Sequence, residues 1–163
     1  MPAIDDMLAA AATRADELAT PGVNPAPRRR VAVVTCMDAR IDVPRLLGLR
    51  PGDAHVIRNA GGLVTDDVVR SLAISQRKLG TAEVALIMHE RCGLHGASDE
   101  EFARALADDG AEPAWRLGGF DDLAAAVRDG VARLRSAREL PRRDEIRGFV
   151  FDPDSGALRE LSD

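Results

Sequence analysis

The hydrophobic positions after residue 30 alternate between short continuous runs and longer stretches with helical spacing. Continuous runs of this length are typical of buried strands, and they occur at 31–36, 54–58, 84–89 and 146–151. Apolar residues three or four positions apart predict helices near 42–47, from 65 to 80, from 98 to about 107 and over 123–134. Because buried strands separated by helices favour parallel pairing, we predict an α/β fold: a mostly parallel central sheet of about four strands, with helices on both faces.

The chain ends in a turn followed by one more short strand. Residues 152–156 are Asp, Pro, Asp, Ser and Gly, and each of these residue types suits a tight turn. The segment 157–161 is therefore predicted to return antiparallel to 146–151 as an edge strand.

The first 30 residues are expected to form a helical arm and a connector. Helical spacing is shared by the apolar residues of this segment, which are Ile4, Met7, Leu8, Ala11, Ala15 and Leu18. Prolines at positions 21, 25 and 27 then predict an extended, semi-rigid connector into the first strand. No second domain boundary is evident, so we interpret residues 1–163 as a single domain with 1–30 as its arm. A helix without a sheet face of its own to cover favours exchange of this arm within a homodimer.

Composition narrows the classes of partner. With 22 basic and 27 acidic side chains the formal net charge is −5, which argues against nucleic acid. No apolar run approaches the roughly 20 residues of a membrane span, so we expect no membrane partner. The first six residues are acidic rather than basic, unlike a secretory signal, and we therefore expect a cytoplasmic protein.

Three side chains with metal-ligand chemistry fall at strand ends. Cys36 ends the first predicted strand, His89 ends the third, and Cys92 follows three residues later. In α/β sheets, ligands bind beyond the carboxyl ends of strands, near a reversal of strand order. Two thiolates and an imidazole favour zinc and leave a fourth position for water or another side chain. The alternative is two ordinary core cysteines and a hydrogen-bonded histidine; we predict one Zn²⁺ per chain, held by these three residues.

Asp38 and Arg40 lie on the turn that leaves the first strand, and their spacing permits more than one role. Arg40 can hold Asp38 ionised, so that the carboxylate accepts a hydrogen bond from water at the zinc. Asp38 can instead bind the metal as a fourth ligand in a closed state. A third interpretation is a plain surface ion pair. We interpret both residues as catalytic.

Further candidates are less specific. Gly61 and Gly62 follow the second strand, where backbone N–H groups could approach a small substrate, although turns also need glycine. His55 lies within a predicted strand and suits the core or an interface. His95 lies in a predicted loop, either solvated or as a proton shuttle.

The chain resembles the β-class carbonic anhydrases in three elements. These are the C-x-D-x-R element that begins at Cys36, the H-x-x-C-G element that begins at His89, and the segment 55–62 between them. The likeness runs from about residue 31 to 151 and is greatest to the short members found in mycobacteria and related bacteria. It implies zinc at Cys36, His89 and Cys92, an Asp38–Arg40 dyad, and an obligate dimer whose N-terminal helix embraces the partner. The residues between His89 and Cys92, Glu-Arg, are bulkier and more charged than the small or acidic pairs common in that family, which bears on access and substrate choice.

The activity that this resemblance implies is reversible hydration of carbon dioxide to bicarbonate and a proton. Zinc makes hydroxide available near neutral pH, and hydroxide attacks the electrophilic carbon. Two alternatives remain: hydrolysis of carbonyl sulfide or carbon disulfide at the same zinc, and a catalytically silent module that binds zinc and bicarbonate or a protein. The expected assembly is a homodimer or a dimer of dimers.

Overall fold

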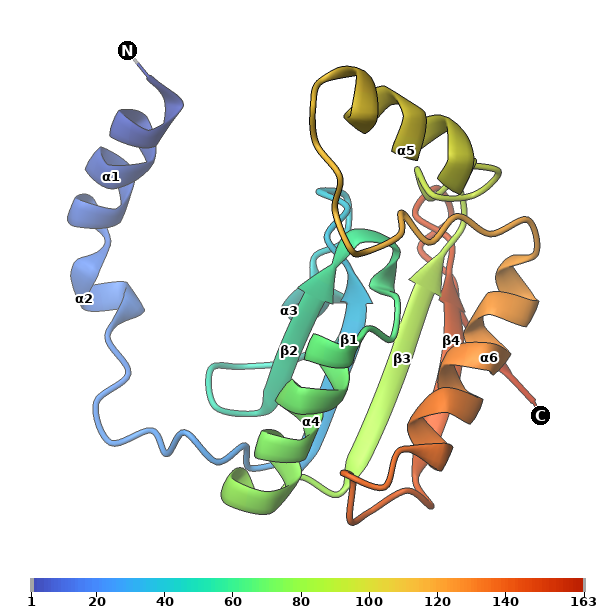
Figure 1. Ribbon diagram of the computed structural model, residues 1–163. Helices are drawn as coiled ribbons and strands as arrows, with labels where there is room; N and C mark the ends of the chain where they lie inside the picture. The colour runs from blue at the N-terminus through green and yellow to red at the C-terminus, as the bar shows by residue number, and fades with distance from the viewer. Residues whose placement is uncertain (1, 163) are drawn as a thin grey trace.

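Within residues 2–162, which the computed structural model describes, five strands form one mixed sheet (Figure 1). In chain order they are β1 (Val31–Cys36), β2 (Ala54–Asn59), β3 (Glu83–His89), β4 (Ile146–Phe151) and β5 (Leu158–Leu161). Their order across the sheet is β2-β1-β3-β4-β5; the first four are parallel and β5 is antiparallel to β4. The predicted α/β class, parallel core and antiparallel edge strand are confirmed.

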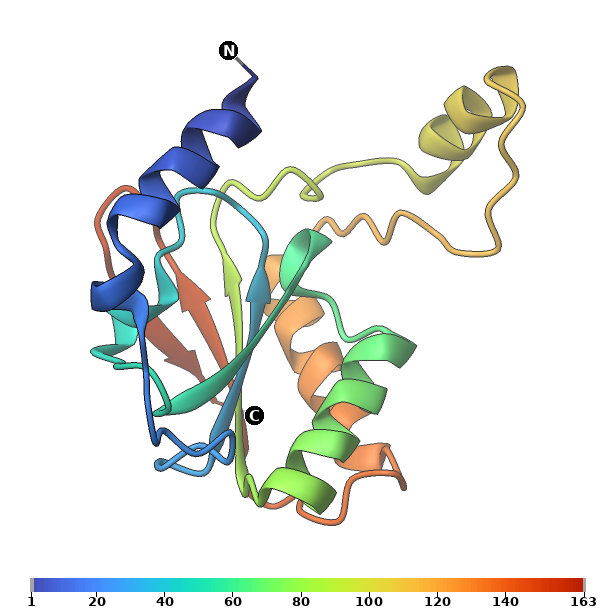
Figure 2. The same ribbon diagram turned by 90° about the vertical axis from the view of Figure 1, so that its left-hand side faces the viewer.

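The helices that cover the two faces of the sheet are α3 (Val43–Leu47), α4 (Asp66–Leu79) and α6 (Leu123–Ser136). Helices α4 and α6 lie on one face and the short α3 lies on the other (Figures 1 and 2). Successive side chains of a strand point to opposite faces, so each strand contacts the helices on both sides of the sheet. Val34 and Leu86 belong to the buried cluster shared with α4 and α6, whereas Val33 and Ile87 belong to the cluster shared with α3. Both faces of the parallel strands are therefore buried, which explains their continuous apolar runs.

The helix boundaries follow from local capping. The Thr65 hydroxyl accepts a hydrogen bond from the backbone N–H of Val68 at the start of α4, and Gly80 ends this helix with a left-handed φ of 74°. Ser98 caps α5 (Asp99–Asp108) in the same way. These are the boundaries that the sequence pattern predicts.

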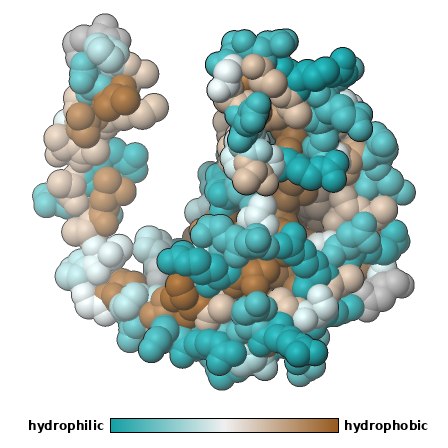
Figure 3. All heavy atoms as spheres, viewed as in Figure 1, coloured by the Kyte–Doolittle hydropathy of each residue, from teal (hydrophilic) through white to brown (hydrophobic). Residues whose placement is uncertain are grey.

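Two N-terminal helices, α1 (Ala3–Thr13) and α2 (Ala15–Leu18), stand apart from the sheet (Figure 1). The predicted helical arm is present, but the backbone leaves helical geometry at Arg14 and divides it in two. No residue of either helix is buried, and apolar side chains gather openly on α1 in Figure 3. The large exposed apolar side chains are Ile4, Met7 and Leu8 on α1 and Leu18 on α2.

The segment that carries α5 also projects from the molecule, as Figure 2 shows. None of the α5 residues is buried. Two backbone hydrogen bonds close the base of the projection, from Gly96 N–H to the Phe120 carbonyl (2.8 Å) and from Phe120 N–H to the Leu94 carbonyl (3.1 Å). Across the described chain, no helix combines the length and the apolar character that crossing a membrane requires.

Candidate metal site

The strand order brings the candidate metal ligands together. After β1 the chain adds β2 on one side of it and then β3 on the other, so the order reverses between β1 and β3. Cys36 ends β1 and His89 ends β3, and these two strands are direct parallel neighbours. Cys92 follows in the turn after β3. The three side chains therefore meet at the carboxyl edge of the sheet, where an α/β fold binds its ligands.

The three ligand atoms form a buried group. The sulfur atoms of Cys36 and Cys92 and a ring nitrogen of His89 lie within 4.8 Å of one another. The exposed fractions of these residues are only 4%, 7% and 1% respectively. Between residues 2 and 162 this is the only group of His, Cys, Asp and Glu side chains that could hold a metal ion.

The His89 ring is arranged as a metal ligand would be. Its Nδ1 donates a hydrogen bond of 2.9 Å to the Glu90 backbone carbonyl, while Nε2 is buried without a hydrogen-bond partner. Burial lowers the pKa of His89, so the ring is neutral and the Nε2 lone pair is free. Zinc-binding histidines usually donate their other ring N–H to a carbonyl or carboxylate, which fixes the tautomer.

The buried thiols of Cys36 and Cys92 would ionise more readily with a cation bound between them. Burial raises the pKa of the Cys92 thiol, and the neighbouring Cys36 sulfur raises it further. A divalent ion offsets both effects, because cysteine coordinates zinc as a thiolate. The donor set of two sulfurs and one imidazole nitrogen therefore fits zinc.

Asp38 and Arg40 form a two-point ion pair beside these ligands. Arg40 Nε donates to Asp38 Oδ1 at 3.0 Å and Arg40 Nη2 donates to Oδ2 at 2.7 Å. The Arg40 backbone N–H also donates to Oδ1. These bonds hold the pKa of Asp38 well below its usual range. Asp38 Oδ2 lies 3.7 Å from Nε2 of His89, so the carboxylate borders the ligand group while remaining paired with Arg40.

Arg58 contributes to the site although the sequence pattern did not single it out. Its Nε donates to the carbonyl of Cys36 at 3.0 Å, and its Nη2 donates to the carbonyl of Asp38 at 2.8 Å. The side chain thus fastens the backbone on both sides of Met37. The signal was its place near the end of β2, because the parallel register sets Arg58 opposite Thr35.

Gly61 and Gly62 lie in a 3₁₀ turn (Ala60–Gly62) with φ values of 75° and 67°, which glycine adopts readily. A Cβ on Gly62 would lie 2.9 Å from the backbone nitrogen of Cys36, and one on Gly61 would lie 2.7 Å from a methyl carbon of Leu94. The backbone at Gly62 therefore lies too close to the end of β1 to leave room for a side chain, which explains the glycine at this position. A role in substrate binding stays a prediction for both residues.

The two other histidines make contacts that support the fold. His55 Nδ1 lies 2.7 Å from the Ser75 hydroxyl, and its Nε2 lies 3.0 Å from the carbonyl of Pro25 in the connector. His95 Nε2 lies 2.9 Å from the Asp121 carbonyl, and its ring stacks on Phe120.

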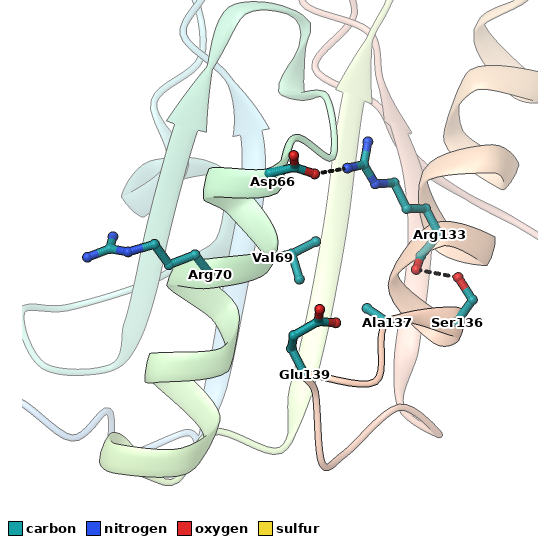
Figure 4. A pocket seen from close by; sticks show the side chains of 7 residues that line it. All are labelled: Asp66, Val69, Arg70, Arg133, Ser136, Ala137 and Glu139. Carbon is teal, nitrogen blue, oxygen red and sulfur yellow. Dashed lines mark hydrogen bonds and ion pairs between the residues drawn. The ribbon is translucent and has the colours of Figure 1, made fainter.

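A cavity of about 380 Å³ between α4 and α6 offers no comparable chemistry (Figure 4). Asp66 and Arg133, which face each other across it, form an ion pair, and the Ser136 hydroxyl donates to the Arg133 carbonyl. Arg70 extends away from the cavity and pairs with Asp67. These polar groups satisfy one another, so the carboxyl edge of the sheet remains the candidate site.

Comparison with known proteins identifies relatives of this chain. The family model described as "Carbonic anhydrase" matches residues 31–115. β-Carbonic anhydrase 1 of Mycobacterium tuberculosis is 47% identical over 137 residues, which cover 83% of this chain and 84% of the relative. A carbon disulfide hydrolase of Acidianus is 32% identical over 157 residues, covering 81% of this chain and 77% of that protein. The crystal structure of a carbonic anhydrase from Streptococcus mutans superposes with a TM-score of 0.92 at 38% identity and covers 99% of each chain.

Proposed function

Because the chain belongs to the β-carbonic anhydrase family, we propose that it catalyses the reversible hydration of carbon dioxide to bicarbonate and a proton, with one Zn²⁺ per chain. The observation that carries the proposal is the buried group of Cys36, His89 and Cys92 beside the paired Asp38 and Arg40. Zinc, when bound, lowers the pKa of a coordinated water so that a nucleophile is available near neutral pH.

The protein side chains hold and orient the reactants. Cys36, His89 and Cys92 supply two negative sulfurs and one neutral nitrogen, and the Glu90 carbonyl keeps the His89 proton on Nδ1. Arg40 keeps Asp38 ionised, so its carboxylate can only accept a hydrogen bond. By accepting a hydrogen bond from the nucleophile, Asp38 would direct an oxygen lone pair toward the carbon of carbon dioxide.

The backbone after β2 is the proposed substrate side of the site. Gly61 and Gly62 are buried next to the end of β1, and a small apolar molecule needs close walls rather than many polar contacts. We assign their backbone N–H groups to the oxygen that gains negative charge as bicarbonate forms.

The proposed assembly is a homodimer whose two chains exchange residues 1–30. Two such dimers could pair into a dimer of dimers. Its support is the apolar side of α1, whose Met7 and Leu8 are 68% and 64% exposed in the single chain. Burial of such side chains against a second copy would stabilise both.

Hydrolysis of carbonyl sulfide or carbon disulfide is the second candidate activity. It is favoured by the carbon disulfide hydrolases among the relatives, which are 32% to 37% identical to this chain. The higher identity of 47% to a mycobacterial carbonic anhydrase favours carbon dioxide.

Turnover of the three gases by the zinc-loaded chain tests the proposal. Carbon dioxide hydration should exceed hydrolysis of either sulfur compound, and His89→Ala should abolish it. Faster release of hydrogen sulfide from carbonyl sulfide or carbon disulfide would favour the second activity. A zinc-replete protein that acts on none of the gases would overturn both and leave a silent binding module.

A further inference from the structure

Arg91 occupies an unusual backbone position between two of the candidate metal ligands. Its φ is 54°, in the left-handed region that residues with a side chain rarely adopt and that glycine or asparagine tolerates far better. The residue lies in the turn from His89 to Cys92. An arginine at such a position needs compensating contacts, and these contacts connect it to the catalytic pair.

The first contact is made by the Arg91 backbone. Its carbonyl accepts a hydrogen bond of 3.1 Å from Arg40 Nη2, the same nitrogen that donates to Asp38 Oδ2. Arg40 Nη2 therefore has two supports, the Asp38 carboxylate and the Arg91 carbonyl, while Nε also donates to Asp38. A change in the turn at Arg91 would move one of the two supports of Arg40.

The second set of contacts is made by the Arg91 side chain. Its guanidinium pairs with Asp152 and Asp154 in the turn between β4 and β5, with 3.1 Å between Arg91 Nη2 and Asp154 Oδ2. Asp152 is itself fixed, because it accepts hydrogen bonds from the Ser155 hydroxyl and the Asp154 backbone. The turn next to the metal ligands is thus anchored to a second, independently held turn.

We propose that Arg91 is a positioning residue for the reaction: its pairing with Asp152 and Asp154 holds the left-handed turn, whose carbonyl keeps Arg40 aligned on Asp38. The inference rests on the proposed function, because Asp38 and Arg40 act in that reaction. Arg91 has no contact with substrate in this role.

Arg91→Gln tests the proposal directly, because it removes both ion pairs and keeps a side chain that disfavours the left-handed backbone. Asp154→Asn is a milder variant that keeps Arg91 and removes one charge from its largely exposed partner. Arg91→Lys keeps the charge and should restore part of the function. The matched control is Arg147→Gln, which breaks a similarly exposed pair with Glu160 between β4 and β5 without touching the site.

The first readout is the Nε–H signal of Arg40 in NMR spectra of the zinc-loaded protein, assigned by its loss in Arg40→Lys. Its exchange with water should be slow in the parent and in Arg147→Gln, faster in Arg91→Gln, and intermediate in the other two variants. The second readout is steady-state carbon dioxide hydration. Arg91→Gln should lower kcat about tenfold with KM and zinc content unchanged, the size of effect typical of groups that hold the residues around a metal site without binding the metal.

Unchanged Arg40 exchange in Arg91→Gln would overturn the proposal, as would a kcat equal to that of Arg147→Gln. The NMR measurement does not depend on turnover. If the parent fails to hydrate carbon dioxide, the proposed function fails while the Arg40 signal still decides whether Arg91 positions it.

Discussion

Two regions of the molecule differ in how completely a single chain buries and hydrogen-bonds their side chains. One is the carboxyl edge of the sheet, and the other is the pair of projecting helices, α1 and α5. At the edge, the three candidate ligands are buried, and Arg40 and Arg58 are each bonded at more than one point. In α1 and α5 no residue is buried, although both carry large apolar side chains. The difference teaches that changes at the edge should alter metal binding and chemistry, whereas changes in the projections should alter assembly.

The largest effect is expected from the ligands themselves. Cys36→Ser, His89→Ala and Cys92→Ser should each lose most of the zinc and lower activity more than about 100-fold, because two remaining ligands cannot fix a tetrahedral ion. Metal analysis of the purified variants provides the measurement, with Arg147→Gln as a control that should retain one zinc. Stoichiometric zinc in any ligand variant would remove that residue from the site.

Gly62→Ala should produce the next largest effect. The added methyl group would meet the backbone nitrogen of Cys36 at 2.9 Å in a left-handed conformation, so we expect a loss of about 3 kcal/mol in the free energy of unfolding. Gly156→Ala is the matched control: its φ is 75° but its Cβ would have no neighbour within 4 Å, and it should lose only about 1 kcal/mol. Urea unfolding measures both, and equal losses would show that the close approach at Gly62 is unimportant.

Removing residues 1–22 tests whether the N-terminal helices hold the assembly together. The truncated protein should sediment as a monomer while the full chain sediments as a dimer or larger, because the exposed apolar side of α1 would be buried only against a second copy. Leu8→Glu should weaken the dimer at least about tenfold, whereas Asp6→Asn, on the same helix, should not. Two equally stable monomers would contradict arm exchange.

The smallest effect concerns the projection that carries α5. Asp99 accepts a hydrogen bond from Gly118 N–H at 2.7 Å and pairs with Arg116, and these contacts lower the pKa of its carboxyl. A depressed pKa stabilises the fold above the unfolded value of about 3.9, and this stability is lost as the pH falls through the lower folded value. Asp99→Asn should therefore lower the melting temperature slightly at pH 7.

The difference between Asp99→Asn and the parent should shrink as the pH is lowered below about 4, in thermal unfolding followed across that range. Glu100→Gln, in the same turn of α5, is the control. A difference that stays constant with pH would mean that the Asp99 carboxylate charge does not hold the projection.

Much of the fold and of the metal site could be predicted from local pattern and residue chemistry. Continuous apolar runs identified the strands because both faces of a parallel sheet are buried, and Thr65 and Gly80 marked α4 because capping depends on neighbouring residues alone. Cys36, His89 and Cys92 could be chosen as candidate ligands because their chemistry favours zinc and because strand ends meet at one edge of the sheet, where the structure brings them together.

The supporting contacts were decided only by the tertiary structure. Arg58 reaches the carbonyl of Cys36 because parallel pairing aligns β2 with β1, and Arg91 reaches Asp152 because the turns after β3 and β4 lie side by side. Sequence pattern also did not reveal that the backbone at Arg91 is left-handed or that Gly62 presses against Cys36. Such contacts join residues far apart in the chain, and their existence depends on strand register and backbone dihedral angles, which amino-acid type alone does not determine.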